Sequence, residues 1–280
     1  MSESKELSGA DTERLVNKAY HLDFSGFVVW TGGEPFLSFN SLLPGLKRAA
    51  DSRFRSEILT GGRWEDYHVK MKAMRDISGI SIRISIDREH QERCTLDRLL
   101  TLIDACLTFN IQVNFTYRQI LPDDSDILLT NLLQQIKNQF PVFYESNRSN
   151  SRWVNRIPQI DTGISWESVN RVETVERRSL IKKRNPIGIN DSNEGVKRCR
   201  MAFRDMVIGS DGLVYPCCGL FSIPRFHRFH YGNALEESWE AMAKRFEHPS
   251  FFSDLILKGL QCDGFDNICS ACLNLLRAFE

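Results

Sequence analysis

The feature that most constrains the fold is a short apolar run followed by a glycine turn. Residues Phe27–Trp30 read Phe, Val, Val and Trp, and Gly32, Gly33, Glu34 and Pro35 follow almost at once. A run this short, rich in β-branched and aromatic residues, is typical of a strand buried on both faces of a parallel sheet. Glycines allow backbone angles that other residues avoid, and Pro35 suits the first turn of a helix. The sequence therefore predicts strand, turn and helix, with Glu34 at the carboxyl end of the strand.

Two interpretations of this turn stay open on the local pattern. Ligands of α/β proteins bind at the carboxyl ends of parallel strands, so Glu34 is a candidate ligand contact. The alternative is a tight strand-to-helix turn whose glutamate is simply solvated.

The chain beyond the turn alternates between strand and helix patterns. Residues 80–87 are a predicted strand, because apolar and polar residues alternate along them. Residues 56–62 and 110–120 are expected strands on the family resemblance described below. Thr95 is a candidate N-cap for a helix whose apolar stripe includes Cys106, and a further helix follows the acidic residues 123–126. This order predicts an α/β fold with a parallel sheet or barrel. Cys106 is then a core residue, and Cys94 has no nearby cysteine partner.

The cysteines form the second strong pattern. The chain has eight, of which six fall at or after Cys199, and its polar start lacks the apolar core of a secretion signal. Such thiols indicate metal binding or reduced cysteines. A predicted β-hairpin with a turn at residues 210–212 leads to Cys217. A later pair of cysteines, separated by two residues, completes a site of four thiols. The predicted ligands are Cys199, Cys217, Cys269 and Cys272, with Cys262 and Cys218 in reserve. Spacing alone leaves iron-sulfur and zinc both open.

Together these motifs resemble the radical S-adenosylmethionine (radical SAM) enzymes of the SPASM/twitch group. The resemblance implies an incomplete (β/α)6 barrel that lacks its first strand, followed by a small cysteine-rich SPASM/twitch-like domain. It implies that the Gly-Gly-Glu-Pro turn contacts the methionine part of S-adenosyl-L-methionine and that the late cysteines hold an auxiliary [4Fe-4S] cluster. The residues implied in cofactor binding are Gly32, Gly33, Glu34, Pro35, Thr60, Ser85 and Asp87.

One part of the family pattern is missing. Radical SAM enzymes hold a second [4Fe-4S] cluster on three closely spaced cysteines after the first strand, whereas the first cysteine here is Cys94. Ser8 and Asp11 are instead spaced as a capping box for an early helix. Three explanations of this gap stay open. The chain is a fragment or has a mis-set start, it is a natural relative that lacks the cluster, or it is one half of a protein that works with another chain. We expect that the chain as it stands does not cleave S-adenosylmethionine.

The resemblance also sets the expected domains and function. A partial barrel is expected at residues 1–146, a bridge at 147–196 and an iron-sulfur domain at 197–280. The bridge is rich in basic residues, which is typical of a solvated linker, and it is expected to contain another strand near Phe143 or Ile157. The expected function is modification of a peptide or protein side chain through hydrogen abstraction, with a peptide or protein substrate and an electron donor protein as partners. The alternatives are a non-catalytic iron-sulfur or zinc module that recognises a peptide or subunit, and a one-cluster redox protein.

Charge and hydrophobicity argue against two classes of partner, nucleic acid and membrane. The formal net charge is zero, which gives no global field for nucleic acid, and no apolar run approaches membrane-spanning length. We therefore expect a cytoplasmic protein with neither nucleic acid nor membrane as a partner. The sequence names no catalytic acid or base, since His21, His68, His90, His227 and His230 lack a partner that spacing would supply.

Overall fold

The computed structural model describes residues 6–21, 26–86, 93–116, 127–141, 166–167, 196–197, 206–216, 230–247 and 260–261. The chain divides into two compact units. One comprises residues 8–175, and the other comprises residues 176–280 together with 1–7. The boundary between them falls inside the segment 147–196 that the sequence assigned to a bridge.

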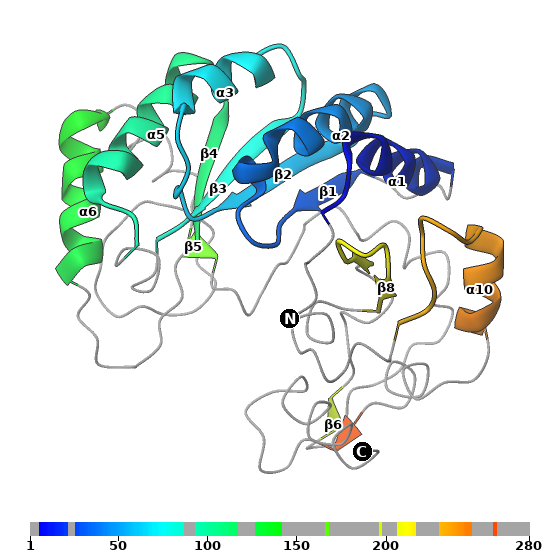
Figure 1. The fold of residues 1–280 in the computed structure, drawn as a ribbon. Helices are drawn as coiled ribbons and strands as arrows, with labels where there is room; N and C mark the ends of the chain where they lie inside the picture. Colours follow the sequence, from blue (N-terminus) through cyan, green and yellow to red (C-terminus); the bar gives the residue numbers. More distant parts are fainter. Residues whose placement is uncertain are drawn as a thin grey trace. The chain divides into compact units, whose positions relative to one another are not determined.

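A parallel five-stranded sheet organises the first unit (Figure 1). Each strand pairs with the next strand in the chain, so the spatial order follows the sequence order. The strands are β1 (Phe27–Trp30), β2 (Arg55–Thr60), β3 (Ile80–Ser85), β4 (Gln112–Thr116) and β5 (Trp166–Glu167). The predicted α/β class with a parallel sheet is thus confirmed, whereas closure into a barrel stays a prediction. The strand after β4 lies at Trp166–Glu167, and the positions expected for it, Phe143 and Ile157, lie outside the described residues.

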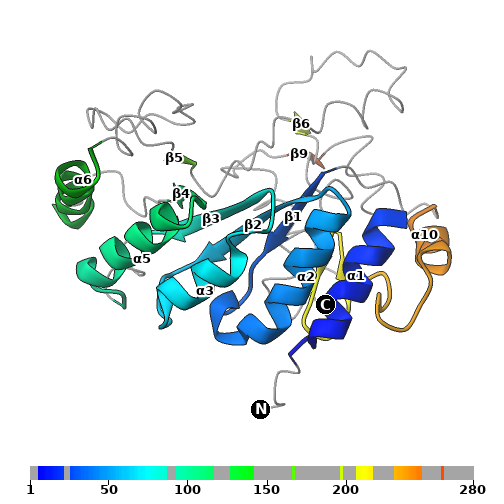
Figure 2. The same ribbon diagram turned by 90° about the horizontal axis from the view of Figure 1, so that it is seen from above.

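The connections between the strands are helical. The elements are α1 (Gly9–His21), the 3-10 helix η1 (Pro35–Ser38), α2 (Phe39–Asp51), α3 (Tyr67–Met74), α5 (Leu96–Thr108) and α6 (Ile127–Gln139). Helices α1, α2, α3 and α5 lie on the same side of the sheet (Figure 2). The predicted caps are present: Ser8 and Asp11 bond reciprocally at the start of α1, and the Thr95 hydroxyl accepts from the backbone of Arg98.

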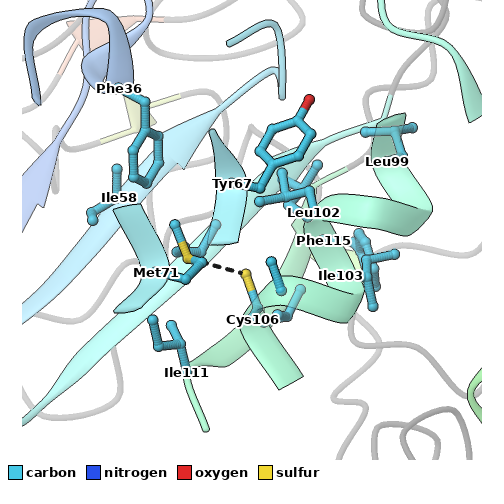
Figure 3. Packing of buried hydrophobic residues seen from close by; sticks show 14 of the residues in the cluster. Phe36, Ile58, Tyr67, Met71, Leu99, Leu102, Ile103, Cys106, Ile111 and Phe115 are labelled. Carbon is cyan, nitrogen blue, oxygen red and sulfur yellow. Dashed lines mark hydrogen bonds between the residues drawn. The ribbon is translucent and has the colours of Figure 1, made fainter. Parts of the chain in front are cut away.

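The core lies between the sheet and these helices. On the sheet side its apolar members are the alternate strand residues Ile58, Ile80, Ile82, Ile84, Val113 and Phe115. Two polar residues of β2, Ser56 and Thr60, are buried on the same side. Figure 3 shows Met71 of α3 and Cys106 of α5 meeting within this layer, with their sulfur atoms 3.6 Å apart. Burial raises the pKa of the Cys106 thiol to about 12, so the thiol stays protonated and unreactive. The prediction that Cys106 is a core residue is confirmed.

The opposite face of the same strands is mainly polar. Because side chains alternate along a strand, residues between the core positions point away from the helices. The polar members of this set are Glu57, Ser81, Arg83, Ser85, Gln112 and Asn114, and we call the surface that they form the polar face. Val29 and Leu59 are apolar residues on the same face. The sheet therefore has one mainly apolar side and one mainly polar side.

Strand β1 differs from its prediction. The sequence predicted burial on both faces, but Val29 is 40% exposed, so this expectation is wrong for that side chain. The cause is position, since β1 ends the described sheet and pairs on one side with β2. On the helix side, Val28 and Trp30 are covered by α1 and α2, which pack closely enough that a Cβ on Gly45 would lie 2.9 Å from Thr12 Cβ.

The second unit contains short antiparallel pairs and one described helix. Strands β7 (Val207–Ile208) and β8 (Val214–Tyr215) form a hairpin, as predicted, and β6 (Val196–Lys197) pairs with β9 (Leu260–Gln261). Helix α10 (Trp239–Glu247) follows a turn that packs on the hairpin. None of the helices in the described part of the chain is long and apolar enough to span a bilayer.

Candidate functional site

The Gly-Gly-Glu-Pro turn leaves the sheet at the carboxyl end of β1. Gly32 and Gly33 have φ angles of +98° and +53°, which side chains rarely adopt. A Cβ on either glycine would meet nothing within 4 Å, so the backbone angle, not crowding, requires glycine there. Both glycines are exposed, and Pro35 begins η1 as predicted. The turn therefore presents bare backbone at the edge of the sheet where parallel α/β proteins bind ligands.

Glu34 is held in place by the tip of the neighbouring strand. Its Oε1 accepts from the Thr60 hydroxyl at 2.7 Å, and its Oε2 accepts from the backbone N–H of Gly61 at 3.0 Å. Oε1 also accepts from the N–H of Phe36 at 3.4 Å, which caps η1. The half-buried carboxylate is thus fixed by three donors, and the interpretation of a merely solvated glutamate is wrong.

The Thr60 hydroxyl has its own orientation fixed. It accepts from the N–H of Gly62 and from the indole N–H of Trp64, each at 3.0 Å. A hydroxyl has two acceptor lone pairs and one donor, so the remaining O–H points to Glu34. Thr60 is 3% exposed and Trp64 is 1% exposed, which removes water as a competing partner. The structure therefore brings together two of the predicted site residues, Glu34 and Thr60.

Aromatic packing supports the hydrogen bonds of Glu34 and Thr60. The ring of Trp64 stacks on Phe36 with centroids 4.0 Å apart and meets Tyr67 edge-on at 4.5 Å. The Lys70 ammonium lies 5.0 Å from the Trp64 ring centroid and donates to the Phe36 carbonyl at 3.1 Å. These contacts join the loops after β1 and β2, so Glu34 is carried by a rigid support. Sequence reasoning missed Trp64 and Gly61, although an indole four residues after Thr60 was a visible signal.

The other implied cofactor residues are only partly placed. Ser85 ends β3 and pairs with Thr116. It alternates with the buried Ile84, so it lies on the polar face, whereas Thr60 lies on the helix side. Among the described residues, no hydrogen bond joins Ser85 to Glu34. Asp87 lies outside the described residues.

In the second unit, the hairpin ends just before Cys217 in the sequence. Pro216 is buried directly after β8, and Cys217 is the next residue in the sequence. The turn depends on Gly212, whose φ is +82° and whose Cβ would lie 2.3 Å from Asn233 Oδ1. The Asp211 carboxylate accepts from the N–H of Leu213 at 3.0 Å and closes the turn. Local chemistry thus fixes the turn of this hairpin, whose described part ends at Pro216.

Asn233 ties the hairpin to helix α10. Its side chain donates to the Asp211 carbonyl at 3.0 Å and accepts from the N–H of Leu235 at 2.9 Å. Its own N–H donates to Glu237, which also pairs with Arg245 at 2.5 Å. The hydrogen bond from Arg245, followed by the bond from the Asn233 backbone, lowers the pKa of Glu237. The hairpin, the turn and the helix therefore form one continuous hydrogen-bonded frame.

The short β6–β9 pair joins the first and later parts of the cysteine-rich segment. Lys197, two residues before Cys199, pairs with Leu260, and Gln261 directly precedes Cys262. All six predicted or reserve ligands lie outside the described residues: Cys199, Cys217, Cys218, Cys262, Cys269 and Cys272. Among the described residues no three His, Cys, Asp or Glu side chains gather as a metal site would require. The four-thiol ligand set therefore stays a prediction.

A family comparison bears on this segment directly. Residues 199–273 match the SPASM family, which is described as an iron-sulfur cluster-binding domain. The predicted resemblance to the SPASM/twitch group is confirmed. The match begins at Cys199 and includes all six late cysteines, so it supports an iron-sulfur cofactor over zinc. A comparison with curated proteins finds no match.

One cysteine and one histidine outside that segment have local roles. Cys94 is 3% exposed, its thiol lies 3.4 Å from the Gly62 carbonyl, and burial raises its pKa. It therefore helps to anchor the loop after β2. His68, for which the sequence supplied no partner, lies 3.5 Å from Asp104 on the surface, with both side chains 51% exposed. An exposed pair of this kind contributes little stability.

Proposed function

We propose that this chain is a radical SAM/SPASM-type protein related to enzymes that modify peptide or protein side chains by hydrogen abstraction. The observation that carries the proposal is the SPASM match at residues 199–273. The parallel sheet supports it, because the Gly-Gly-Glu-Pro turn opens at the carboxyl end of β1 with Glu34 already positioned. Neither feature alone specifies the reaction.

The proposal assigns a role to each part. Cys199, Cys217, Cys269 and Cys272 hold one auxiliary [4Fe-4S] cluster, with Cys262 and Cys218 as reserves. That cluster relays electrons or holds substrate. The turn at Gly32, Gly33, Glu34 and Pro35 orients the methionine part of S-adenosylmethionine, and the other implied residues, Thr60, Ser85 and Asp87, complete the cofactor site.

Glu34 has the acceptor capacity for this role. An ionised carboxylate offers about four lone-pair positions, and the bonds from Phe36, Thr60 and Gly61 use three of them. The remaining position on Oε2 suits one N–H of an ammonium group. A non-catalytic iron-sulfur module is the second candidate, because the bonds within the chain also give Glu34 a purely structural use.

Metal analysis tests the cluster. After anaerobic reconstitution with iron and sulfide, the wild-type chain should contain about four irons per chain, the content of one [4Fe-4S] cluster. Cys269→Ala and Cys272→Ala should each lose most of it. Cys106→Ala is the matched control, because this thiol is fully buried in the other unit. Zinc in place of iron, or full iron content in both Cys269→Ala and Cys272→Ala, would refute the cluster assignment.

Calorimetry separates the two candidate functions. The radical SAM proposal predicts saturable binding of S-adenosylmethionine that Glu34→Gln weakens, whereas a pure binding module predicts none. Cleavage is a separate matter. With dithionite, the reconstituted chain should release no 5'-deoxyadenosine, because it carries no closely spaced cysteine triplet.

A further inference from the structure

The orientation of the Glu34 carboxylate depends on a hydroxyl group that can rotate. Two of its three donors are backbone N–H groups, and the third is the Thr60 hydroxyl, which makes the shortest of the bonds at 2.7 Å. The chain fixes the direction of a backbone donor, whereas a hydroxyl hydrogen turns about its C–O bond to suit its neighbours. The groups that fix the Thr60 hydroxyl therefore also help to fix Glu34.

Trp64 is one of these groups. Its indole N–H donates to the Thr60 oxygen at 3.0 Å, and the Gly62 N–H donates to the same atom at the same distance. The two bonds use both lone pairs of the oxygen, which leaves its O–H for Glu34. Because hydrogen bonds in a chain polarise one another, the bond from the indole also strengthens the bond to Glu34. Trp64 is 1% exposed, so water has no access to replace the indole.

The Trp64 ring is itself held in one orientation. Phe36 stacks on it with centroids 4.0 Å apart, Tyr67 meets it edge-on at 4.5 Å, and the Lys70 ammonium lies 5.0 Å from its centroid. The Trp64 carbonyl accepts from Arg98 Nη2 at 3.2 Å, which ties this part of the loop to α5. The indole N–H is thus aligned with Thr60 by packing on several sides.

We propose that Trp64 is a positioning residue for ligand binding, which acts through Thr60 to hold Glu34 with Oε2 open to an ammonium group. This inference rests on the proposed function, in which the ammonium belongs to the methionine part of S-adenosylmethionine. It adds to the cofactor site a residue that the family resemblance does not imply.

A second tryptophan of the same unit provides a matched control. The indole N–H of Trp30 donates at 3.1 Å to the hydroxyl of Ser56, which lies on the same side of β2 four residues before Thr60. The two pairs have the same chemistry, but among the described residues no hydrogen bond joins Ser56 to Glu34. Trp30→Phe therefore removes an equivalent bond outside the proposed relay.

A double-mutant cycle tests the inference. Calorimetry gives the Kd of S-adenosylmethionine for the reconstituted full chain as wild type, Trp64→Phe, Thr60→Val and the double variant. Trp64→Phe removes the N–H and keeps an aromatic ring, and Trp64→benzothienylalanine removes the N–H and keeps the bicyclic shape. Two changes that act through one hydroxyl do not add, whereas independent changes do. Thr60→Ser supplies a further background, because it keeps the hydroxyl.

Each outcome has a defined meaning. We expect both Trp64 variants to weaken binding about fivefold, the equivalent of one hydrogen bond, in the wild-type and Thr60→Ser backgrounds. In Thr60→Val they should weaken it no further, and Trp30→Phe should leave Kd unchanged. Circular dichroism in the near ultraviolet confirms that each variant is folded.

Two kinds of result would overturn the inference. If the Trp64 variants bind as tightly as wild type, or weaken binding by the same factor with and without the Thr60 hydroxyl, Trp64 has no positioning role and the proposed function stands. If the wild-type chain does not bind S-adenosylmethionine at all, the cofactor assignment of the proposed function fails, and this inference fails with it.

Discussion

The Thr60 hydroxyl is the most informative single group to remove, because three partners depend on it. Thr60→Val keeps the shape of the side chain but leaves Glu34 Oε1, the Gly62 N–H and the Trp64 indole N–H without this partner. Each lost bond costs roughly 1 kcal/mol, and a buried donor left unpaired costs up to about 3 kcal/mol. With Trp64 only 1% exposed, we expect a total loss of about 3 kcal/mol in the free energy of unfolding.

The assay is thermal unfolding of the first unit followed by circular dichroism. For a unit of this size, 1 kcal/mol corresponds to a shift of about 2–4 °C in Tm, so Thr60→Val should lower Tm by about 6–12 °C. Thr60→Ser is the control, because it keeps the hydroxyl and loses only one methyl group, worth about 1 kcal/mol. Equal Tm values for the two variants would show that the hydroxyl contributes no more than one methyl group, about 1 kcal/mol, and would refute our account of how Glu34 is positioned.

Three further predictions concern other contacts. Gly45→Ala should lower Tm even though alanine is the better helix former, because its Cβ would lie 2.9 Å from Thr12 Cβ; a rise in Tm would contradict the packing. Gly212→Ala should destabilise the second unit and reduce its iron content, whereas Ser210→Ala, in the exposed part of the same turn, should change neither. Iodoacetamide at pH 8 should not label Cys106 until the chain is unfolded in urea, as mass spectrometry of its peptide would show. The pKa of this thiol is about 12 in the folded chain and about 9 in the unfolded chain. Its contribution to the free energy of unfolding is therefore complete below pH 9 and is lost as the pH rises toward 12.

Features that depend on neighbouring residues were predictable from the sequence. The capping box of Ser8 and Asp11, the Thr95 cap and the hairpin turn at Asp211 and Gly212 each involve residues no more than a few positions apart. The alternation of residues 80–87 likewise predicted β3. In all of these the backbone geometry is set locally, so the pattern of residue types is enough.

Features that depend on the pairing of distant strands were not predictable. Glu34 acquires its partners from Thr60 and Gly61 only because β1 and β2 align in parallel. The contact between Glu57 and Arg83 needs the register of β2 on β3 as well as the choice of face. The exposure of Val29 follows from the position of β1 at the end of the described sheet, which its apolar run does not reveal.

The paired strands of the two units are separated by different lengths of chain. These separations limit when each strand pair can form during synthesis. In the sheet every strand pairs with its immediate successor, so each segment can dock as soon as it leaves the ribosome. The pair of β6 with β9 instead joins Val196 to Gln261, across most of the SPASM segment. The β6–β9 pair can therefore form only after translation has passed Gln261, by which time the sheet of the first unit has had the opportunity to assemble.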